Sequence, residues 1–353
     1  MDDLFSKGKI LGYEFKYTER NLERASDFET KTLLFLLGID QIKSQVCFLF
    51  IDCFNDISGS DKNCSVLWDY QSKGVSNMTP FQIGESLLTL FENYSSELNF
   101  GKYALFMPKT KSTYVENESI LEFGISNFGK YSTKIRQGLE AEIQRRNKTV
   151  TFTNEEMQRI SSFLEIVIFV VDRGEKQDYI KNLVSFKDKD LKPKEFYSEI
   201  FNEIRKEQFN KKLDSIHGSH IHSISEALKF NKHLQSKEIS ILVVNRLIGV
   251  DLFKRLAIPL GFLSEVSGLN SNDTKDLILE CSAKISKAVF DKNNKTAFWK
   301  FLEKAMIETN NNSSLTSHEI YNNISDEGKI KYGHLFGQAG IYLISLLQEG
   351  LAQ

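Results

Sequence analysis

The spacing of apolar residues in the first part of the chain alternates between helical and strand-like patterns. Residues 21–37 carry apolar side chains three and four positions apart, which predicts an amphipathic helix that stops at Gly38. Residues 45–54 are rich in β-branched and aromatic side chains and predict a strand, while residues 64–73 predict a second one. Residues 58–63 have turn composition. We therefore expect a helix followed by a β-hairpin.

The same kinds of pattern in the rest of the chain predict further helices and strands, which together suggest two domains. Thr79 and Pro80 are typical of a helix start, and further elements are predicted at residues 103–107 (strand), 130–148 (helix), 154–164 (helix) and 166–171 (strand). This order predicts an α/β domain over residues 1–185, with a mixed sheet and flanking helices. Residues 186–353 are expected to form a mainly helical domain, with helices at residues 193–216, 223–234, 273–290, 296–309 and 332–351 and a strand or buried helical turn at 239–244.

Composition narrows the possible partners. The chain has 353 residues, 41% of them apolar, which is enough for two domains with real cores. Its net charge of −2 gives no overall attraction to nucleic acid, so a DNA-binding surface would have to be a local patch. The densest basic stretch is a candidate for that patch or is simply a solvated helix face: Lys130, Lys134, Arg136, Arg145, Arg146 and Lys148.

The chain also suggests a reducing, aqueous environment. No signal peptide is visible at the start and no apolar run approaches the roughly 18 residues of a membrane span. The four cysteines, Cys47, Cys53, Cys64 and Cys281, form no CxxC pair and are expected to be buried free thiols. We therefore expect a cytoplasmic protein that does not enter a membrane.

Acidic, amide and basic side chains gather around the predicted hairpin. On the second strand, Asp69, Gln71 and Lys73 alternate onto one face, whereas Asp56 follows the first strand on the same face as Asp52. Antiparallel pairing would bring Asp56 close to Gln71 and Lys73 only if the hairpin were bent or bulged. If they meet, Asp56 and the Gln71 amide oxygen could bind Mg²⁺, and Lys73 could orient an attacking water and neutralise phosphate charge.

The identity of a second acid stays open at this point. Glu29, on the preceding helix, is our candidate, and Asp52 competes with it. Asp69 is expected to lie near the metal without binding it directly. The alternative is purely structural: Asp56 would be an ordinary turn residue, and Gln71 and Lys73 would belong to a solvated strand face.

These residues resemble the PD-(D/E)xK phosphodiesterases, in particular the variant in which Gln-x-Lys replaces the acidic motif. The likeness lies in Asp56, in Gln71-Ser72-Lys73 fifteen residues later, and in the acidic helix before them, and it covers roughly residues 10–180. It implies a restriction-endonuclease-like fold, Asp56 and Gln71 at a Mg²⁺ or Mn²⁺ ion, and Lys73 acting on the attacking water. Because Gln stands where most members have an acid, fewer carboxylates remain for metal.

The variant is typical of the double-stranded DNA endonuclease domain of CD-NTase-associated effectors and of Lamassu anti-phage systems. The resemblance therefore implies a DNA endonuclease subunit of a Lamassu-like complex, held inactive by an SMC-like or HerA-like ATPase partner and active as a homo-oligomer. The helical domain would serve docking or oligomerisation. Three alternatives remain: a non-catalytic interaction subunit that kept the nuclease fold, a nuclease paired with a HerA-type ATPase outside a Lamassu system, and a nuclease that acts on RNA.

Overall fold

The computed structural model describes ten stretches of the chain, which form two compact units. The described residues are 12–15, 23–148, 152–188, 190–213, 215–252, 257–291, 293, 295–312, 314–326 and 333–351. Unit 1 contains the residues up to Tyr179 together with Phe201–Ser236, and unit 2 contains Ile180–Ile200 and the residues from Lys237 onward. This division differs from the boundary expected at residue 185, because the chain returns to unit 1 for Phe201–Ser236 before unit 2 is completed.

Unit 1 is built on a seven-stranded mixed sheet, which confirms the expected α/β class. Its strand order is β6-β7-β5-β4-β3-β2-β9, with β4, β5 and β7 parallel to one another and the other neighbours antiparallel. The strands are β2 (Phe48–Ile51), β3 (Ile57–Ser60), β4 (Leu67–Ser72), β5 (Phe100–Pro108), β6 (Glu122–Phe123), β7 (Ile168–Asp172) and β9 (His233–Gln235). A separate two-stranded sheet pairs β1 (Tyr13–Glu14) with β8 (His220–Ile221).

The predicted hairpin is in fact a three-stranded meander. Strand β3 lies between β2 and β4, where the turn-like composition of residues 58–63 had predicted a turn. All four residues of β3 are buried. The Ser58 hydroxyl donates to Asp69 at 3.0 Å, and the Ser60 hydroxyl donates to the Val66 carbonyl at 2.8 Å, so both polar side chains are satisfied inside the sheet. Tertiary pairing therefore overrides the local turn preference.

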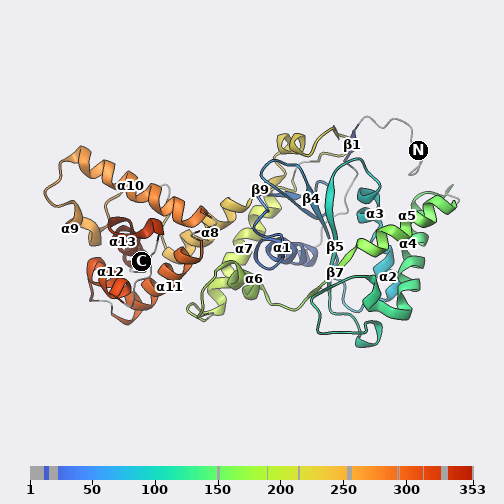
Figure 1. Ribbon diagram of the computed structural model, residues 1–353, viewed down its shortest axis with the longest axis horizontal. Helices are drawn as coiled ribbons and strands as arrows, with labels where there is room; N and C mark the ends of the chain where they lie inside the picture. The colour runs from blue at the N-terminus through green and yellow to red at the C-terminus, as the bar shows by residue number, and fades with distance from the viewer. Residues whose placement is uncertain are drawn as a thin grey trace. The chain divides into compact units, whose positions relative to one another are not determined.

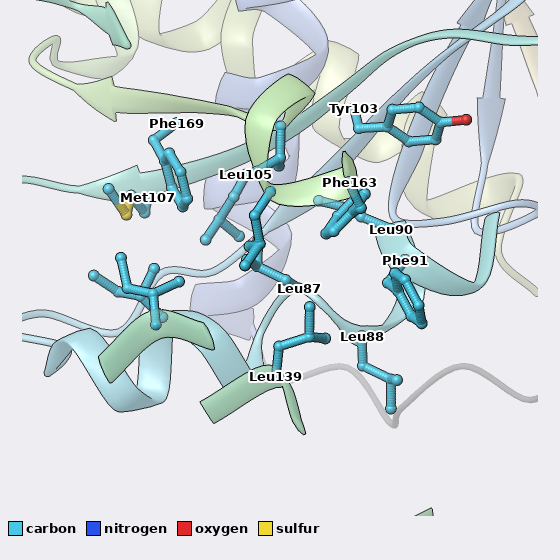
Figure 2. Close-up of a cluster of buried hydrophobic side chains, with 14 of the residues drawn as sticks. Leu87, Leu88, Leu90, Phe91, Tyr103, Leu105, Met107, Leu139, Phe163 and Phe169 are labelled. Carbon is cyan, nitrogen blue, oxygen red and sulfur yellow. The ribbon is translucent and has the colours of Figure 1, made fainter. Parts of the chain in front are cut away.

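Helices cover both faces of this sheet (Figure 1). Helix α1 (Glu23–Gly38) packs one face, where Phe28 and Phe35 contact Phe106 with ring centroids 5.2 Å and 5.6 Å apart. The other face packs against four helices: α2 (Pro80–Glu85), α3 (Leu88–Tyr94), α4 (Ser132–Arg146) and α5 (Asn154–Ile166). Figure 2 shows the core between them, in which Leu105 and Met107 of β5 lie among Leu87, Leu139 and Phe163. Helices thus sandwich the strand ends that carry the candidate residues.

Unit 2 is helical in its described residues. It contains α8 (Ser236–Ile248), α9 (Leu263–Val266), α10 (Ser271–Phe290), α11 (Lys295–Asn311), α12 (Ser317–Asp326) and α13 (Gln338–Leu351). The first residue of α8, Ser236, is counted with unit 1. Residues 339–347 of α13 are all buried, so this helix lies at the centre of the unit. The open choice at residues 239–244 is decided in favour of a helix.

Two connecting segments depart from the sequence-based expectations. The helix predicted at 223–234 is shorter and of a different type: a 3-10 helix spans Ile224–Phe230, Asn231 takes a left-handed φ of 53°, and the strand β9 follows. The helices α6 (Lys176–Leu183) and α7 (Lys194–Asn210) each contribute residues to both units. The start of the helix predicted at 332 lies outside the described residues. Among the helices of the described residues, none has the length and apolarity needed to cross a membrane.

Candidate active site

The third strand brings Asp56 and Gln71 together. In the antiparallel pair of β3 and β4, Ile57 lies opposite Tyr70, so Asp56 falls at the level of Gln71. Asp56 Oδ2 accepts hydrogen bonds from Gln71 Nε2 at 2.6 Å and from the Ser72 backbone N–H at 2.7 Å. The contact that a two-stranded hairpin could make only by bending is therefore made by regular pairing.

Lys73 lies at the same strand end. Its backbone N–H donates to the Phe106 carbonyl at 2.9 Å, which continues the pairing with β5 beyond the last residue of β4. Burial raises the pKa of Asp56, and the positive charge of Lys73 is the strongest of the influences that lower it. The Asp56 carboxylate and the Gln71 amide are therefore in direct contact, and Lys73 lies at the same strand end, where its positive charge lowers the pKa of Asp56.

Glu29 extends the site from the helix side. Its side chain is buried, and Lys212 and Gln208 both direct donors to Glu29 Oε2, the second at 3.4 Å. Burial raises the pKa of Glu29 to about 7, and the nearby Asp56 carboxylate is the next largest cause. One turn further along α1, the Thr32 hydroxyl donates to Ser72 Oγ at 3.2 Å, which ties this helix to the end of β4. Glu29 and Asp56 are therefore electrostatic neighbours.

The other two candidate acids have different environments. Asp52 takes a left-handed φ of 52°, and its N–H donates to the Asp56 carbonyl at 3.1 Å, closing the turn between β2 and β3. Asp69 is fully buried and accepts from Asn93 Nδ2 at 2.7 Å, from Ser58 at 3.0 Å and from Asn55 at 3.4 Å. Burial raises the pKa of Asp69 to about 7. Asp69 therefore has a structural part: its hydrogen bonds tie β4 to Ser58 of β3 and to Asn93 of α3.

The donor set suits a hard divalent cation. Because Gln71 uses Nε2 to donate to Asp56, its Oε1 is the atom that can serve as a neutral ligand. The Asp56 and Glu29 carboxylates are oxygen donors of the same class, which is the class that Mg²⁺ accepts while it keeps several waters. Among the described residues, no three His, Cys, Asp or Glu side chains gather closely enough to hold a metal by themselves. The amide oxygen and water would therefore have to complete the coordination.

The remaining predicted residues lie on α4 or beside it, and most have partners within the protein. Arg145 forms two hydrogen bonds of 2.6 Å with Glu142, and Arg136 donates to Ser161 at 2.8 Å. Arg146 lies 3.8 Å from Glu92, and the Lys130 ammonium lies 5.4 Å from the ring centre of Tyr131. Lys134 is exposed. Most of these basic side chains therefore have partners within the protein and do not require DNA to explain their charge.

Sequence reasoning missed Lys212 and Gln208. Lys212 follows the C-terminal end of α7 and lies 183 positions from Glu29 in the chain. Gln208 also accepts a hydrogen bond from Thr30 Oγ1 at 2.8 Å, so it binds two neighbouring residues of α1. Neither residue stands in a motif, and only the packing of α7 against α1 reveals them. No family model, no curated protein and no solved structure matches this chain.

Proposed function

We propose that unit 1 is a metal-dependent phosphodiesterase of restriction-endonuclease-like fold that cuts double-stranded DNA. The observation that carries the proposal is the hydrogen bond between Asp56 and Gln71 with Lys73 at the same strand end. An acid, an amide and an amine that meet at the carboxyl ends of parallel strands form a site of the kind in which open α/β sheets bind ligands. A solvated strand face is a poorer account, because Gln71 is only 5% exposed.

Each residue has a distinct part in this mechanism. Asp56 would hold the metal through its carboxylate, and Gln71 would complete the coordination while it fixes Asp56 in place. A bound Mg²⁺ or Mn²⁺ supplies Lewis-acid stabilisation of the phosphate and lowers the pKa of a water. Lys73 holds the attacking water in line and offsets the charge that develops on the phosphate oxygens. Glu29 is the second acid of our proposal, since the nearby Asp56 carboxylate helps to raise its pKa.

The choice of DNA and of partners rests on the family resemblance alone. Within it, the chain is an effector subunit of a Lamassu-like anti-phage complex. An SMC-like or HerA-like ATPase would keep it silent, and unit 2 would provide docking or oligomerisation. The competing proposal from another class is a non-catalytic interaction subunit. Gln71 in place of an acid favours that reading, whereas the presence of both Asp56 and Lys73 at one strand end opposes it.

Plasmid cleavage separates these proposals. Wild-type protein, with and without its neighbouring gene products, is incubated with supercoiled DNA and Mg²⁺ or Mn²⁺. Lys73→Ala should lower the cleavage rate by roughly 10²–10³-fold, the typical loss for one group that stabilises developing charge. Lys62→Ala is the matched control, because Lys62 is an exposed lysine in the turn before β4.

Three outcomes would count against the proposal or a part of it. If wild-type protein cuts no DNA under any of these conditions, the interaction-subunit reading stands. If a structured RNA is cut while the plasmid survives, the phosphodiesterase assignment holds and the choice of DNA is wrong. Loss of cleavage in Lys62→Ala equal to that in Lys73→Ala would show that the assay responds to general charge instead of to the site.

A further inference from the structure

A buried ion pair joins the candidate site to the end of α7. The ammonium group of Lys212 contacts Glu29 Oε2, and the two side chains are only 7% and 6% exposed. Gln208, one turn earlier in α7, binds Glu29 and Thr30. A buried carboxylate that already has a strong cationic partner is neutralised, so it attracts a second cation weakly.

Hydrogen bonds through Lys232 hold the backbone of Lys212 in this position. Its backbone carbonyl accepts from the Lys232 ammonium at 3.4 Å, and Lys232 is itself only 2% exposed. The Lys232 carbonyl in turn accepts from the Ile51 N–H of β2 at 2.8 Å. This series of contacts anchors Lys212 to the strand that leads into the turn of Asp52 and Asp56. The fold of unit 1 therefore fixes the position of Lys212, and this position does not depend on a flexible side chain at the surface.

The Lys212 charge also reaches Asp56. It lowers the pKa of Asp56 as well as that of Glu29, so both carboxylates lie within its electrostatic range. A divalent ion bound by the same two carboxylates would be repelled by an ammonium group at this short range. The cation and Lys212 therefore compete for Glu29.

We infer that the Lys212–Glu29 ion pair is an internal competitor of the divalent metal, and that Lys212 must leave Glu29 before the site binds metal tightly. The inference rests on the proposed function, because it assigns a regulatory device to that same site. Lys212 follows the helix α7, whose first residues belong to unit 2 and whose last residues belong to unit 1. A change that loosens the end of this helix would thereby raise the affinity for metal.

Mn²⁺ binding tests the inference without relying on cleavage. Free Mn²⁺ is titrated by electron paramagnetic resonance into the full-length protein carrying Lys73→Ala, which keeps the readout independent of catalysis. Adding Lys212→Gln, which retains a hydrogen-bond donor without the charge, should tighten Mn²⁺ binding by about tenfold or more. Lys212→Met is the second variant in case the amide alters packing. Lys211→Gln is the matched control, since Lys211 is the adjacent lysine and donates to Asn231.

The outcomes separate this inference from the proposed function. If the Lys73→Ala protein binds Mn²⁺ and the folded Lys212 variants bind it no more tightly, the inference is overturned while the metal site stands. If neither the parent nor any Lys212 variant binds Mn²⁺, the proposed function fails and the inference fails with it. Glu29→Gln, combined with Lys212→Gln, should abolish the gain; a gain that persists would show that Glu29 is not the shared ligand and would also overturn the inference.

Discussion

Replacing Gly138 of α4 by alanine should destabilise unit 1, although the same change stabilises most helices. Helices α2 and α4 cross through two glycines: a Cβ at Gly138 would lie 2.0 Å from the Phe81 carbonyl oxygen, and one at Gly84 would lie 1.9 Å from the Ile135 carbonyl oxygen. Because ordinary contacts begin at 3.4 Å, the helices would have to separate by about 1.4 Å at Gly138. The opposing atoms are backbone, so no side-chain rotation relieves the clash.

The expected size follows from two opposing effects. Alanine gains about 1 kcal/mol over glycine from helix propensity. Overpacking a tight core costs about 1–3 kcal/mol, and a backbone clash belongs at the upper end of that range. The separation would also loosen Ile83, Ile135 and Leu139, which are fully buried at the crossing. The net loss in the free energy of unfolding should therefore be about 2 kcal/mol.

Urea unfolding monitored by Trp68 measures this loss. The chain has two tryptophans, and a Trp299→Phe background leaves Trp68 of β4 as the sole reporter, in unit 1. Trp299 Nε1 has no hydrogen-bond partner among the described residues, so phenylalanine sacrifices no such bond there. Gly124→Ala is the control, because its φ is −86° and a Cβ there would meet nothing within 4 Å. A Gly138→Ala variant as stable as its parent would refute the close crossing of α2 and α4.

Two further predictions concern buried polar and thiol groups. Asn93→Leu should lower the free energy of unfolding by about 1–3 kcal/mol in the same assay, because Asp69 and the Phe54 carbonyl lose a buried donor. The control Asn99→Leu, at an exposed position, should lower it much less. Equal losses in the two variants would contradict the role of Asn93. Cys47 alone should react rapidly with Ellman's reagent at pH 8, since Cys53, Cys64 and Cys281 are buried. Burial raises the pKa of Cys53 to about 12 and that of Cys281 to about 11, so thiolate is scarce at both. A second fast thiol, or a fast phase that survives Cys47→Ser, would contradict this.

Elements with strong local signals were predictable from the sequence. The Thr79 and Pro80 start is confirmed with a complete capping box to Gln82, and the helix predicted at 154–164 is present with Thr153 as its cap. Elements decided by tertiary pairing were not. Strand β3 reads as a turn in isolation, and β9 lies in a segment whose apolar spacing suggested a helix. Both strands depend on pairing, β3 with β4 and β9 with β2, that no local pattern identifies.

The site divides along the same line. Asp56, Gln71 and Lys73 lie within one short stretch of chain, so the sequence could single them out although it could not give their geometry. Lys212, just after α7, joins them, and its contact with Glu29 exists only because the end of α7 packs beside α1. Coupling over such a sequence distance carries no periodic or compositional signal. The contact between Asp56 and Gln71 needs no bend in the hairpin, because the additional strand β3 makes it by regular pairing.

Strand parity explains why these groups share one edge of the sheet. Because β3 is antiparallel to both β2 and β4, the latter two run in the same direction, and their carboxyl ends lie at the same edge. The turn of residues 52–56 follows β2 at that edge, Gln71 and Lys73 lie at the end of β4, and the parallel strands β5 and β7 end there too. With only two strands, the connection after the first would lie at the edge where the second begins, far from Lys73. The four buried residues of β3 thus determine whether the acid and the amine lie at the same edge of the sheet.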